Sequence, residues 1–365
     1  MQLKTLRLIN FKNYQDETVV FSKGFTAILG KNGAGKTNIL EAIHYLSLTR
    51  GYSNSTDAQN IRRDQPFFTA IGKLEETAQM QEIQVSFDGT GKTLRLDGKE
   101  CRRFSDHLGK FPVVQIAPQD ISLIWETGEI RRRFFDLWMS QINRSFLEDL
   151  IRYQHFLKQR NTLLKNIRDG AQADAELLNL YENEMTGPAD RISQARKAFL
   201  EQISPALTGF YQRLAGEAEK INIEVESEFI PLQGNPWPKL REKDIAAGRT
   251  TLGPHRDEFH FHLNGMEVRK YGSQGQQKSF LIALKLASYA VISSLSGIKP
   301  VLLLDDIFDK MDDLRLLNLL SMTDSDDFGQ VILTDSSPVR ARQKLTEAGI
   351  DFGVISVEDG KIINQ

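Results

Sequence analysis

A glycine-rich segment at residues 30–37 constrains the fold of this chain more than any other feature. Gly30-Lys-Asn-Gly-Ala-Gly-Lys36-Thr37 fits the pattern G-x-x-x-x-G-K-[ST] of a phosphate-binding loop. A short apolar run at residues 24–29 precedes it, and apolar residues at helical spacing follow it from Ile39 to Leu48. Strand, glycine loop and helix are the context that such a loop requires, and an incidental glycine turn would not need it. The sequence therefore predicts an α/β fold built around a P-loop.

This segment also predicts the ligand. Glycines let successive backbone N–H groups face the phosphates of ATP, and the following helix adds its positive N-terminal end. We expect Lys36 to reach the β- and γ-phosphates and to be catalytic, and the Thr37 hydroxyl to bind Mg²⁺. The expected cofactor-binding residues here are Gly30, Lys31, Asn32, Gly33, Ala34, Gly35, Lys36, Thr37 and Asn38.

A second motif lies far along the chain. Val301-Leu-Leu-Leu-Asp305-Asp306 is an apolar run that ends in two carboxylates, as in a Walker B strand. We expect Asp305 to hold the Mg²⁺ and Asp306 to polarise the attacking water, so both are candidate catalytic residues. An apolar strand followed by a solvated acidic turn would look the same. The P-loop in the same chain favours the catalytic interpretation.

A third motif opens a strongly apolar helix. In Tyr271-Gly-Ser-Gln-Gly-Gln-Gln-Lys278, Ser273 and Gln276 have the S-x-x-Q spacing of a capping box, so a well-capped helix alone would explain them. The same helix end, with Gly275, would let a phosphate approach free amides. Because Lys36 already serves the phosphates within one subunit, this second anion-binding end suggests a homodimer in which it touches the partner's ATP. The candidate residues are Ser273, Gln274, Gly275 and Gln276.

The length and the pattern predict about two domains. The chain has 365 residues, and residues 131–185 are rich in helical apolar spacing among charged side chains. We expect the N-terminal part of an ATPase head at 1–125, a helical lobe at 126–225, and the C-terminal part of the head at 226–365. The nucleotide core is thus split by an insertion.

Composition excludes several classes of protein. A single cysteine, Cys101, permits no internal disulfide, which fits a reducing compartment. No N-terminal signal pattern and no run of about 18 apolar residues is found, so we expect no membrane partner and a cytoplasmic protein. The net charge of −2 excludes a wholly basic DNA binder, although a basic patch remains compatible.

Five segments resemble the RecF family of ABC-type ATPases. Ser-Gln-Gly-Gln-Gln from Ser273 looks like the ABC signature in the form used by chromosome-maintenance and repair members, and the order of the segments matches from the first residues to Asp312. The other four segments are Leu8-Ile-Asn-Phe-Lys-Asn-Tyr14, Gly33-Ala-Gly-Lys-Thr-Asn-Ile-Leu-Glu-Ala42, Arg131-Arg-Arg-Phe-Phe-Asp136 and Thr251-Leu-Gly-Pro-His-Arg-Asp-Glu258.

This resemblance implies a fold and a function. It implies an ABC-type head of mixed sheet and helices, with a mostly helical second lobe and no long coiled coil. Family members are DNA-repair ATPases that bind ATP, dimerise on DNA and dissociate after slow hydrolysis. They act with RecR and RecO to direct RecA onto single-stranded gaps, so DNA, RecR, RecO and RecA are implied partners of a nucleoid-associated protein.

The resemblance also implies roles for two further residues. Gln119 lies at the Q-loop position, where its amide could sense Mg²⁺ and the γ-phosphate, although a proline turn capping a helix fits equally well. Asp312 lies at the D-loop position and would cross the dimer interface.

The sequence departs from the family at four places. Ser53 and Lys278 replace usual arginines, Lys310 replaces a usual glutamate, and Thr334-Asp335-Ser336 occupies the place of a transporter's switch histidine. The first three departures leave DNA or dimer contacts open. The fourth leaves the γ-phosphate sensor unidentified.

Basic clusters are the candidates for DNA contact. They are Arg62-Arg63, Arg102-Arg103, Arg131–Arg133 and the cations of the helical lobe. Each could equally be a solvated helix face. Arg131–Arg133 is favoured because three arginines on one turn should not all find local partners. His255 could be a catalytic base, or with Arg256 could organise the loop before the signature.

Two other functions remain alternatives. A transporter ATPase subunit would need a membrane partner, an aromatic residue stacking before the P-loop and a switch histidine, and the helical insertion also disfavours it. A nuclease-coupled ATPase would need a metal-binding nuclease domain after the head, for which the residues following Asp312 are too few.

Overall fold

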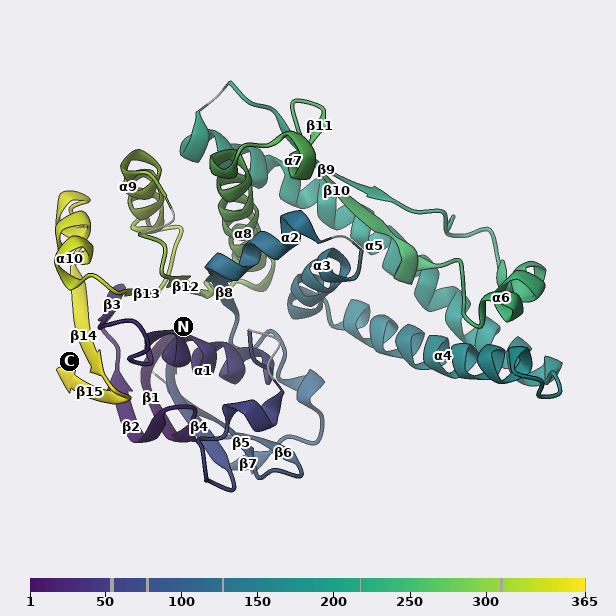
Figure 1. Ribbon diagram of the computed structural model, residues 1–365, viewed down its shortest axis with the longest axis horizontal. Coiled ribbons are helices and arrows are strands. Elements are labelled where there is room, and N and C mark those ends of the chain that lie inside the picture. The colour runs from purple at the N-terminus through teal and green to yellow at the C-terminus, as the bar shows by residue number, and fades with distance from the viewer. Residues whose placement is uncertain (53–55, 77–78, 127, 217, 309–310, 365) are drawn as a thin grey trace. The chain divides into compact units, whose positions relative to one another are not determined.

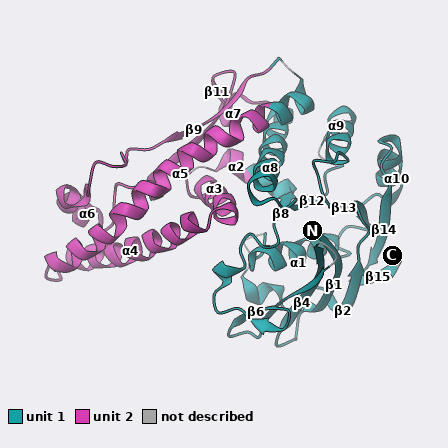
Figure 2. Ribbon diagram, turned by 180° about the vertical axis from the view of Figure 1, so that it is seen from behind, with its two compact units in different colours: residues 1–121, 209–218, 274–365 teal, residues 122–208, 219–273 magenta. Residues whose placement is uncertain are grey.

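The computed structural model describes residues 1–52, 56–76, 79–126, 128–216, 218–308 and 311–364. The expectations for Ser53 and Lys310 therefore lie outside the described residues. The described chain divides into two compact units (Figure 2). Unit 1 comprises Met1–Ile121, Gly209–Ala218 and Gln274–Gln365, and unit 2 comprises Ser122–Thr208 and Glu219–Ser273.

Two six-stranded sheets form the frame of unit 1. One is antiparallel, in the order β2-β1-β4-β5-β6-β7, and the other has the order β15-β14-β3-β13-β12-β8 (Figure 1). The strands are β1 Gln2–Phe11, β2 Tyr14–Val20, β3 Phe25–Leu29, β4 Phe68–Glu76, β5 Gln79–Phe87, β6 Lys92–Leu96, β7 Lys99–Glu100, β8 Val113–Ile116, β12 Val301–Asp305, β13 Val331–Asp335, β14 Phe352–Glu358 and β15 Lys361–Asn364.

The strand that leads into the P-loop lies inside the second sheet. β3 pairs in parallel with β13 on one side and with β14 on the other, with Phe25 opposite both Val331 and Phe352. All five residues of β3 and of β12 are buried, which explains why these strands are continuous apolar runs without alternation. The carboxyl ends of β3, β13 and β12 meet at one edge, because these strands are parallel.

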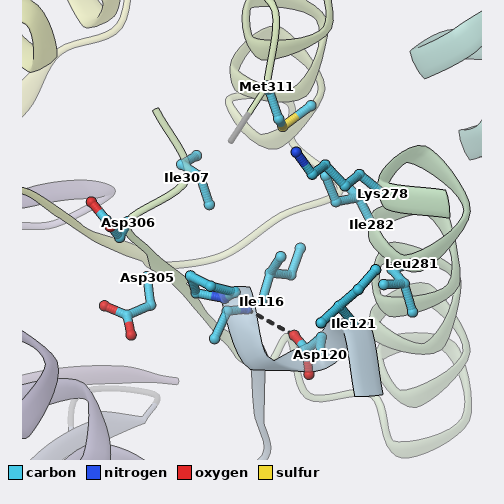
Figure 3. A pocket seen from close by; sticks show the side chains of 12 residues that line it. Ile116, Asp120, Ile121, Lys278, Leu281, Ile282, Asp305, Asp306, Ile307 and Met311 are labelled. Carbon is cyan, nitrogen blue, oxygen red and sulfur yellow. Dashed lines mark hydrogen bonds between the residues drawn. The ribbon is translucent and has the colours of Figure 1, made fainter. Parts of the chain in front are cut away.

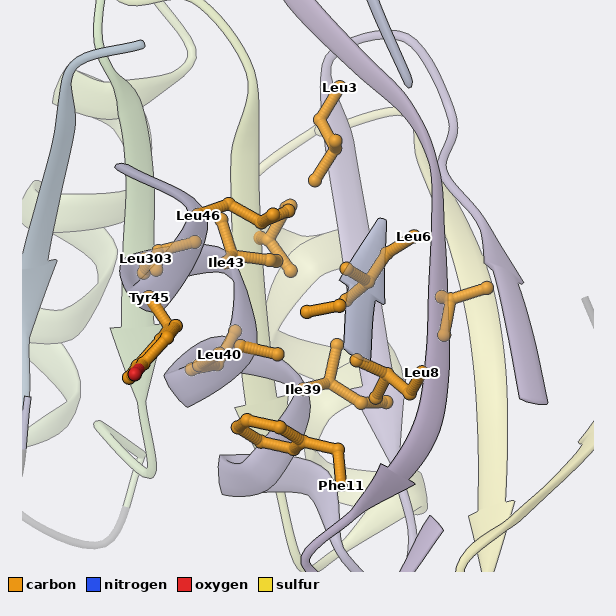
Figure 4. Close-up of a cluster of buried hydrophobic side chains, with 14 of the residues drawn as sticks. Leu3, Leu6, Leu8, Phe11, Ile39, Leu40, Ile43, Tyr45, Leu46 and Leu303 are labelled. Carbon is orange, nitrogen blue, oxygen red and sulfur yellow. The ribbon is translucent and has the colours of Figure 1, made fainter. Parts of the chain in front are cut away.

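The helices of unit 1 follow from the same sequence patterns. They are α1 Lys36–Leu48, α8 Gln274–Ser296, α9 Asp313–Thr323 and α10 Pro338–Glu347, with the short turns η1 Asp57–Asn60, η2 Phe104–Asp106 and η3 Pro118–Ile121. The helical spacing expected after Thr37 is confirmed, since Ile39, Leu40, Ile43 and Leu46 are fully buried. They pack against Leu3, Leu6, Leu8 and Phe11 of β1 and Leu303 of β12 (Figure 4), so α1 joins both sheets in one core.

Unit 2 is mostly helical and also contains a small sheet. Its helices are α2 Ser122–Trp125, α3 Glu129–Ile142, α4 Arg144–Arg168, α5 Ala175–Ala215, α6 Arg241–Ala247 and α7 Val268–Tyr271, with the turns η4 Trp237–Leu240 and η5 Pro254–Arg256. The last turns of α5 belong to unit 1. The strands β9 Ile221–Glu226, β10 Glu258–Leu263 and β11 Met266–Glu267 pair in the order β11-β10-β9.

This division differs from the expected one. We expected the head to resume at residue 226, whereas residues 219–273 belong to unit 2 and the head resumes at Gln274. The physical reason is apolar packing of the small sheet on the helices. Phe259 of β10 stacks on Phe135 of α3 at 4.3 Å between ring centroids, and Phe261 meets the same ring edge-on.

By length and composition alone, helix α8 would be long and apolar enough to cross a membrane. Its best 18-residue window has a mean hydropathy of 1.5, and 72% of that window is buried inside the protein. An apolar helix that is mostly buried is typical of the core of a folded unit. Even Lys285, near the middle of α8, is buried.

Candidate nucleotide-binding site

The glycine loop has the curled backbone that the sequence predicts. Gly33 and Gly35 have φ angles of 79° and 116°, in the left-handed region that favours glycine. A side chain at Gly35 would overlap Asn13 and would come within 2.8 Å of the Tyr14 hydroxyl. Both the conformation and the packing therefore require glycine at this position.

Two residues of the first hairpin support the loop from outside. The Asn13 amide donates to the carbonyl of Ala34 at 2.9 Å, and the Tyr14 hydroxyl donates to the carbonyl of Gly35 at 3.0 Å. Asn38 in turn donates to the Asn13 side chain at 2.8 Å. The sequence analysis assigned no role to Asn13 or Tyr14, because a contact across 21 or more positions leaves no local periodicity.

Lys36 is held over the loop by backbone carbonyls. Its ammonium group donates to the carbonyl oxygens of Gly30 at 2.7 Å and of Lys31 at 2.9 Å. Burial lowers the pKa of Lys36, and the nearby charges of Asp306, Asp335 and Asp305 oppose that shift. The ammonium group of Lys36 therefore lies at the loop that would bind phosphate.

The Walker B strand brings its first carboxylate to the P-loop helix. The Thr37 hydroxyl donates to Oδ1 of Asp305 at 3.0 Å, although the two residues are 268 positions apart. Thr334, at the carboxyl end of β13, donates to the same oxygen at 2.7 Å. Burial raises the pKa of Asp305, and the hydrogen bonds from Thr334 and Thr37 work against that shift. The predicted meeting of Thr37 and Asp305 is therefore present in the structure.

A cavity of about 170 Å³ lies where these groups converge. It is lined by Asn32, Gly33, Gly35, Lys36, Thr37, Asn38, Asp306 and Thr334. Among the residues that the structure describes, no group of three His, Cys, Asp or Glu side chains could cage a metal alone. A hydroxyl and a carboxylate fit Mg²⁺, which is commonly bound by one or two carboxylates together with phosphate oxygens. The residues present therefore fit Mg²⁺ with a nucleoside triphosphate.

The residues expected to form the signature, Ser273–Gln276, are not part of this cavity. Helix α8 begins at Gln274, so Ser273 directly precedes it and Gln274, Gly275 and Gln276 form its first turn. Asp312 caps α9 and accepts a hydrogen bond from the backbone N–H of Arg315 at 3.0 Å. Neither Ser273–Gln276 nor Asp312 lines the 170 Å³ cavity.

The Q-loop position is a turn with one exposed and one buried polar residue. Gln119 is exposed on η3 and does not line the 170 Å³ cavity. Its neighbour Asp120 is buried and accepts from the N–H of Ala117 at 2.8 Å. Lys285 of α8 lies 2.9 Å from Asp120 and donates to the Tyr52 hydroxyl at 2.8 Å. A buried ion pair thus joins this turn to the signature helix.

A second, mainly apolar cavity of about 270 Å³ adjoins the Walker B acids. Figure 3 shows its walls, which come from the η3 turn, from α8 and from the segment after β12. Asp305 and Asp306 lie at one side, and Lys278 and Met311 contribute longer side chains. Lys278, which stands where the family usually has arginine, therefore belongs to the surroundings of the Walker B strand.

Arg131–Arg133 were expected not all to find local partners, and this prediction is wrong. Arg131 is buried and donates to the carbonyls of Leu123, Ile124 and Phe259 at 2.6–2.8 Å. Arg132 donates to the carbonyl of Asp257 at 2.6 Å, and Arg133 pairs with Glu129 one turn earlier. All three arginines therefore have partners within unit 2: Arg131 and Arg132 bind backbone carbonyls, and Arg133 binds a carboxylate.

His255 is fully engaged within unit 2. The Tyr153 hydroxyl lies 2.6 Å from its Nδ1, and its Nε2 faces the carbonyl of Thr250 at 3.1 Å. Since a carbonyl can only accept, Nε2 carries the proton and Nδ1 accepts from Tyr153. Burial lowers the pKa of His255 to about 4. These contacts favour the loop-organising role over that of a catalytic base.

The two sheets of unit 1 and the nucleotide-binding site together define an ABC-type P-loop ATPase head. Residues 5–205 match the AAA-domain family. The chain is 38% identical over 363 residues to the DNA replication and repair protein RecF of Cytophaga hutchinsonii, covering 99% of this chain and 96% of that protein. It is also 38% identical to RecF of Flavobacterium johnsoniae, covering 93% of this chain and 95% of that protein.

Solved structures agree with these relatives. The recombination mediator protein RecF with ATP superposes with a TM-score of 0.87 at 27% identity, covering all of this chain and 97% of the other. The Smc head domain of Pyrococcus furiosus has a TM-score of 0.56 at 17% identity, covering 99% of this chain and 95% of the other, and shows the shared fold. The chain belongs to the RecF family, and it is a DNA-repair ATPase.

Proposed function

We propose that this chain is an ATP-driven clamp on DNA, in which two copies close around two ATP molecules. The observation that carries the proposal is the contact of Thr37 with Asp305 at 3.0 Å beside the Gly30–Thr37 loop. This contact brings the P-loop and the Walker B strand together into one phosphate and Mg²⁺ site, although the insertion that forms unit 2 separates them in the sequence. Binding is the working step of such a clamp, and slow, DNA-dependent hydrolysis opens it.

Each residue of the site has a distinct part in this proposal. The backbone of Gly30–Asn38 holds the triphosphate, and Lys36 supplies a positive charge to its terminal groups. Thr37 and Asp305 hold Mg²⁺, which neutralises phosphate charge when bound. Asp306 orients the water that attacks the γ-phosphate.

The second half of each site comes from another copy of the chain. Ser273 precedes a 23-residue helix whose first turn contains Gln274–Gln276, and the positive end of this helix suits the γ-phosphate of an opposing ATP. The absence of these residues and of Asp312 from the lining of the cavity around Lys36 supports a role in a neighbouring site. Loss of the γ-phosphate would then remove the anion that both copies hold.

The partners follow from the family. One solved relative is described as a recombination mediator in the RecFOR pathway. For this chain we propose binding to duplex DNA near single-strand gaps, with RecR and RecO directing RecA onto the gap. The site of action is then the nucleoid in the cytoplasm.

A substitution of the P-loop lysine tests the clamp. Lys36→Arg should abolish ATP-induced dimerisation measured by light scattering, because a planar guanidinium cannot replace a compact ammonium between two carbonyls. Lys23→Arg, an exposed lysine just before β3, is the matched control and should dimerise normally. ATP-induced dimers of the Lys36→Arg protein would overturn the proposal.

A mixing experiment tests whether the sites are shared between copies. Ser273→Arg should bind ATP yet fail to dimerise, because it blocks the end of the signature helix. A mixture of Lys36→Arg and Ser273→Arg proteins should regain ATP-dependent association, since one of its two sites combines an intact P-loop with an intact signature. If the mixture stays monomeric with ATP, the shared-site arrangement is wrong.

The DNA part has its own measurement. Gel shifts on gapped, duplex and single-stranded DNA, with and without ATP, should show tighter binding with ATP and a preference for gapped duplex. ATP-independent binding of equal strength to all three would contradict a clamp.

A further inference from the structure

Thr334, the first of the three residues at the place of a transporter's switch histidine, contacts both Walker B acids. It is the penultimate residue of β13 and pairs in register with Asp305 of β12. Only 1% of its surface is exposed, and its hydroxyl faces the cavity beside the P-loop. The position that sequence comparison left without a function is thus an inner wall of the nucleotide site.

The hydrogen bonds of this hydroxyl have a fixed direction. Thr334 Oγ1 donates to Oδ1 of Asp305 at 2.7 Å and accepts from the backbone N–H of Asp306 at 3.1 Å. An amide can only donate and a carboxylate accepts, so the single hydroxyl proton must point to Asp305. One side chain therefore fixes the carboxylate of the first acid and the backbone of the second.

The backbone of Asp306 needs such support. Its φ angle is 49°, in the left-handed region that is unfavourable for residues other than glycine. Strain of this kind persists where surrounding contacts hold it, and the bond from the Asp306 N–H to Thr334 is such a contact. This strained residue also lines the cavity beside the P-loop, where the proposed water would be oriented.

The two hydroxyls on Asp305 are not equivalent. Thr37 is exposed at the start of α1, where it can reach a metal, whereas Thr334 is buried inside the sheet. Both bond the same carboxylate oxygen. Partners that hold a ligating carboxylate set its orientation and its affinity for the metal, although they do not touch the metal.

We propose that Thr334 is a positioning residue that presets Asp305 and Asp306 for Mg²⁺ and the attacking water. It acts on the acids and leaves contact with the phosphate to other groups. The inference rests on the proposed ATP and Mg²⁺ site. It adds a specific consequence: the Mg²⁺ dependence of nucleotide binding should depend on the Thr334 hydroxyl, whereas Mg²⁺-free nucleotide binding should not.

The test is a Mg²⁺ titration of binding of a fluorescent, non-hydrolysable ATP analogue. Thr334→Val, which keeps the volume and removes the hydroxyl, should raise the half-saturating Mg²⁺ concentration by about 10- to 100-fold. Thr334→Ser should remain close to the wild type, and the affinity for the analogue in EDTA should be the same in all variants. Mn²⁺ in place of Mg²⁺, with bound Mn²⁺ measured by electron paramagnetic resonance, gives a readout that needs no turnover.

Two further variants keep the outcome decisive. Thr26→Val removes another buried threonine hydroxyl from the neighbouring strand β3 and should leave the Mg²⁺ dependence unchanged. If Thr334→Val does not fold, Thr334→Ala removes the hydroxyl without adding bulk. It should raise the half-saturating Mg²⁺ concentration in the same way. Unchanged Mg²⁺ dependence in the folded variant, or an equal shift in Thr26→Val, overturns the inference. Absence of Mg²⁺-dependent binding in the wild type would instead overturn the proposed function.

Discussion

Buried charged side chains have different roles in the two units. In unit 1, Lys36 and Asp305 are buried beside the P-loop, where an incoming nucleotide and metal would complete their interactions. In unit 2, Arg160 and Arg196 are each buried between two acids and are already satisfied. Beside the P-loop, unit 1 thus keeps buried charge available for a ligand, whereas these ion pairs of unit 2 serve cohesion.

This comparison separates two kinds of sequence signal. The charges of unit 1 lie in short motifs, because phosphate binding requires a fixed local backbone. The charges of unit 2 are scattered along the chain, as in Arg196 with Asp136 and Asp257, because internal ion pairs need only meet in space. A cation with no motif around it is therefore more informative about packing than about ligands.

The strongest test of cohesion in unit 2 removes a buried arginine. Arg196→Met should lower the free energy of unfolding by about 3–5 kcal/mol, because Asp136 and Asp257 would be left buried and uncompensated. Urea denaturation followed by circular dichroism measures the loss. Arg191→Met on the same helix breaks an exposed pair with Asp149 and should cost about 0–1 kcal/mol. Equal losses in the two variants would contradict the role assigned to the buried pairs.

A second test uses one buried histidine from each unit. Burial lowers the pKa of His44 to about 3 and of His255 to about 4, from an ordinary value of 6.5. Below pH 6.5 the unfolded chain binds more protons at these sites, so stability falls as the pH falls. Between pH 7 and pH 5 each histidine should cost about 2 kcal/mol of unfolding free energy.

Urea titrations at both pH values measure this effect. His44→Gln and His255→Gln should each reduce the acid-induced loss relative to the wild type, in unit 1 and unit 2 respectively. A wild-type pH dependence in either variant would show that the buried ring in that unit is not what destabilises it in acid.

The smallest expected effect distinguishes ligand binding from cohesion. Tyr14 in unit 1 donates its hydroxyl to the carbonyl of Gly35 in the P-loop, and Tyr153 in unit 2 donates to His255. Each Tyr→Phe change should cost about 1 kcal/mol of stability. Only Tyr14→Phe should also weaken ATP binding in a fluorescence titration, by roughly fivefold, because only that bond holds the loop. If Tyr153→Phe weakened ATP binding as much, the assignment of ligand binding to unit 1 would be wrong.

Local physics made part of this structure predictable. Gly30–Thr37, the helix after it and the strand before Asp305 follow from glycine conformation and apolar periodicity, which act over a few residues. The residues that hold the site in place from other elements cannot be predicted in this way. Thr334 reaches the site because β13 pairs with β12, and Asn13 and Tyr14 reach it because the first hairpin contacts the loop. Nothing near these residues in the sequence indicates what they touch.

The errors have the same origin. We expected Arg131–Arg133 not all to find local partners, but all three are paired, and one of the carbonyls that Arg131 binds, that of Phe259, is 128 positions away. The second unit extends to Ser273 because β9 and β10 pack on its helices, a contact that neither strand pattern specifies alone.

The place of β3 in its sheet has a consequence for the biosynthesis of the chain. Both of its neighbours, β13 and β14, are made more than 300 residues after Phe25. Until they have been synthesised, this apolar strand has two unpaired edges, which is a condition that invites aggregation. Pairing so distant along the chain also folds slowly. We therefore expect nascent chains to depend on chaperones, and chains released before residue 331 to be unable to complete the phosphate-binding core.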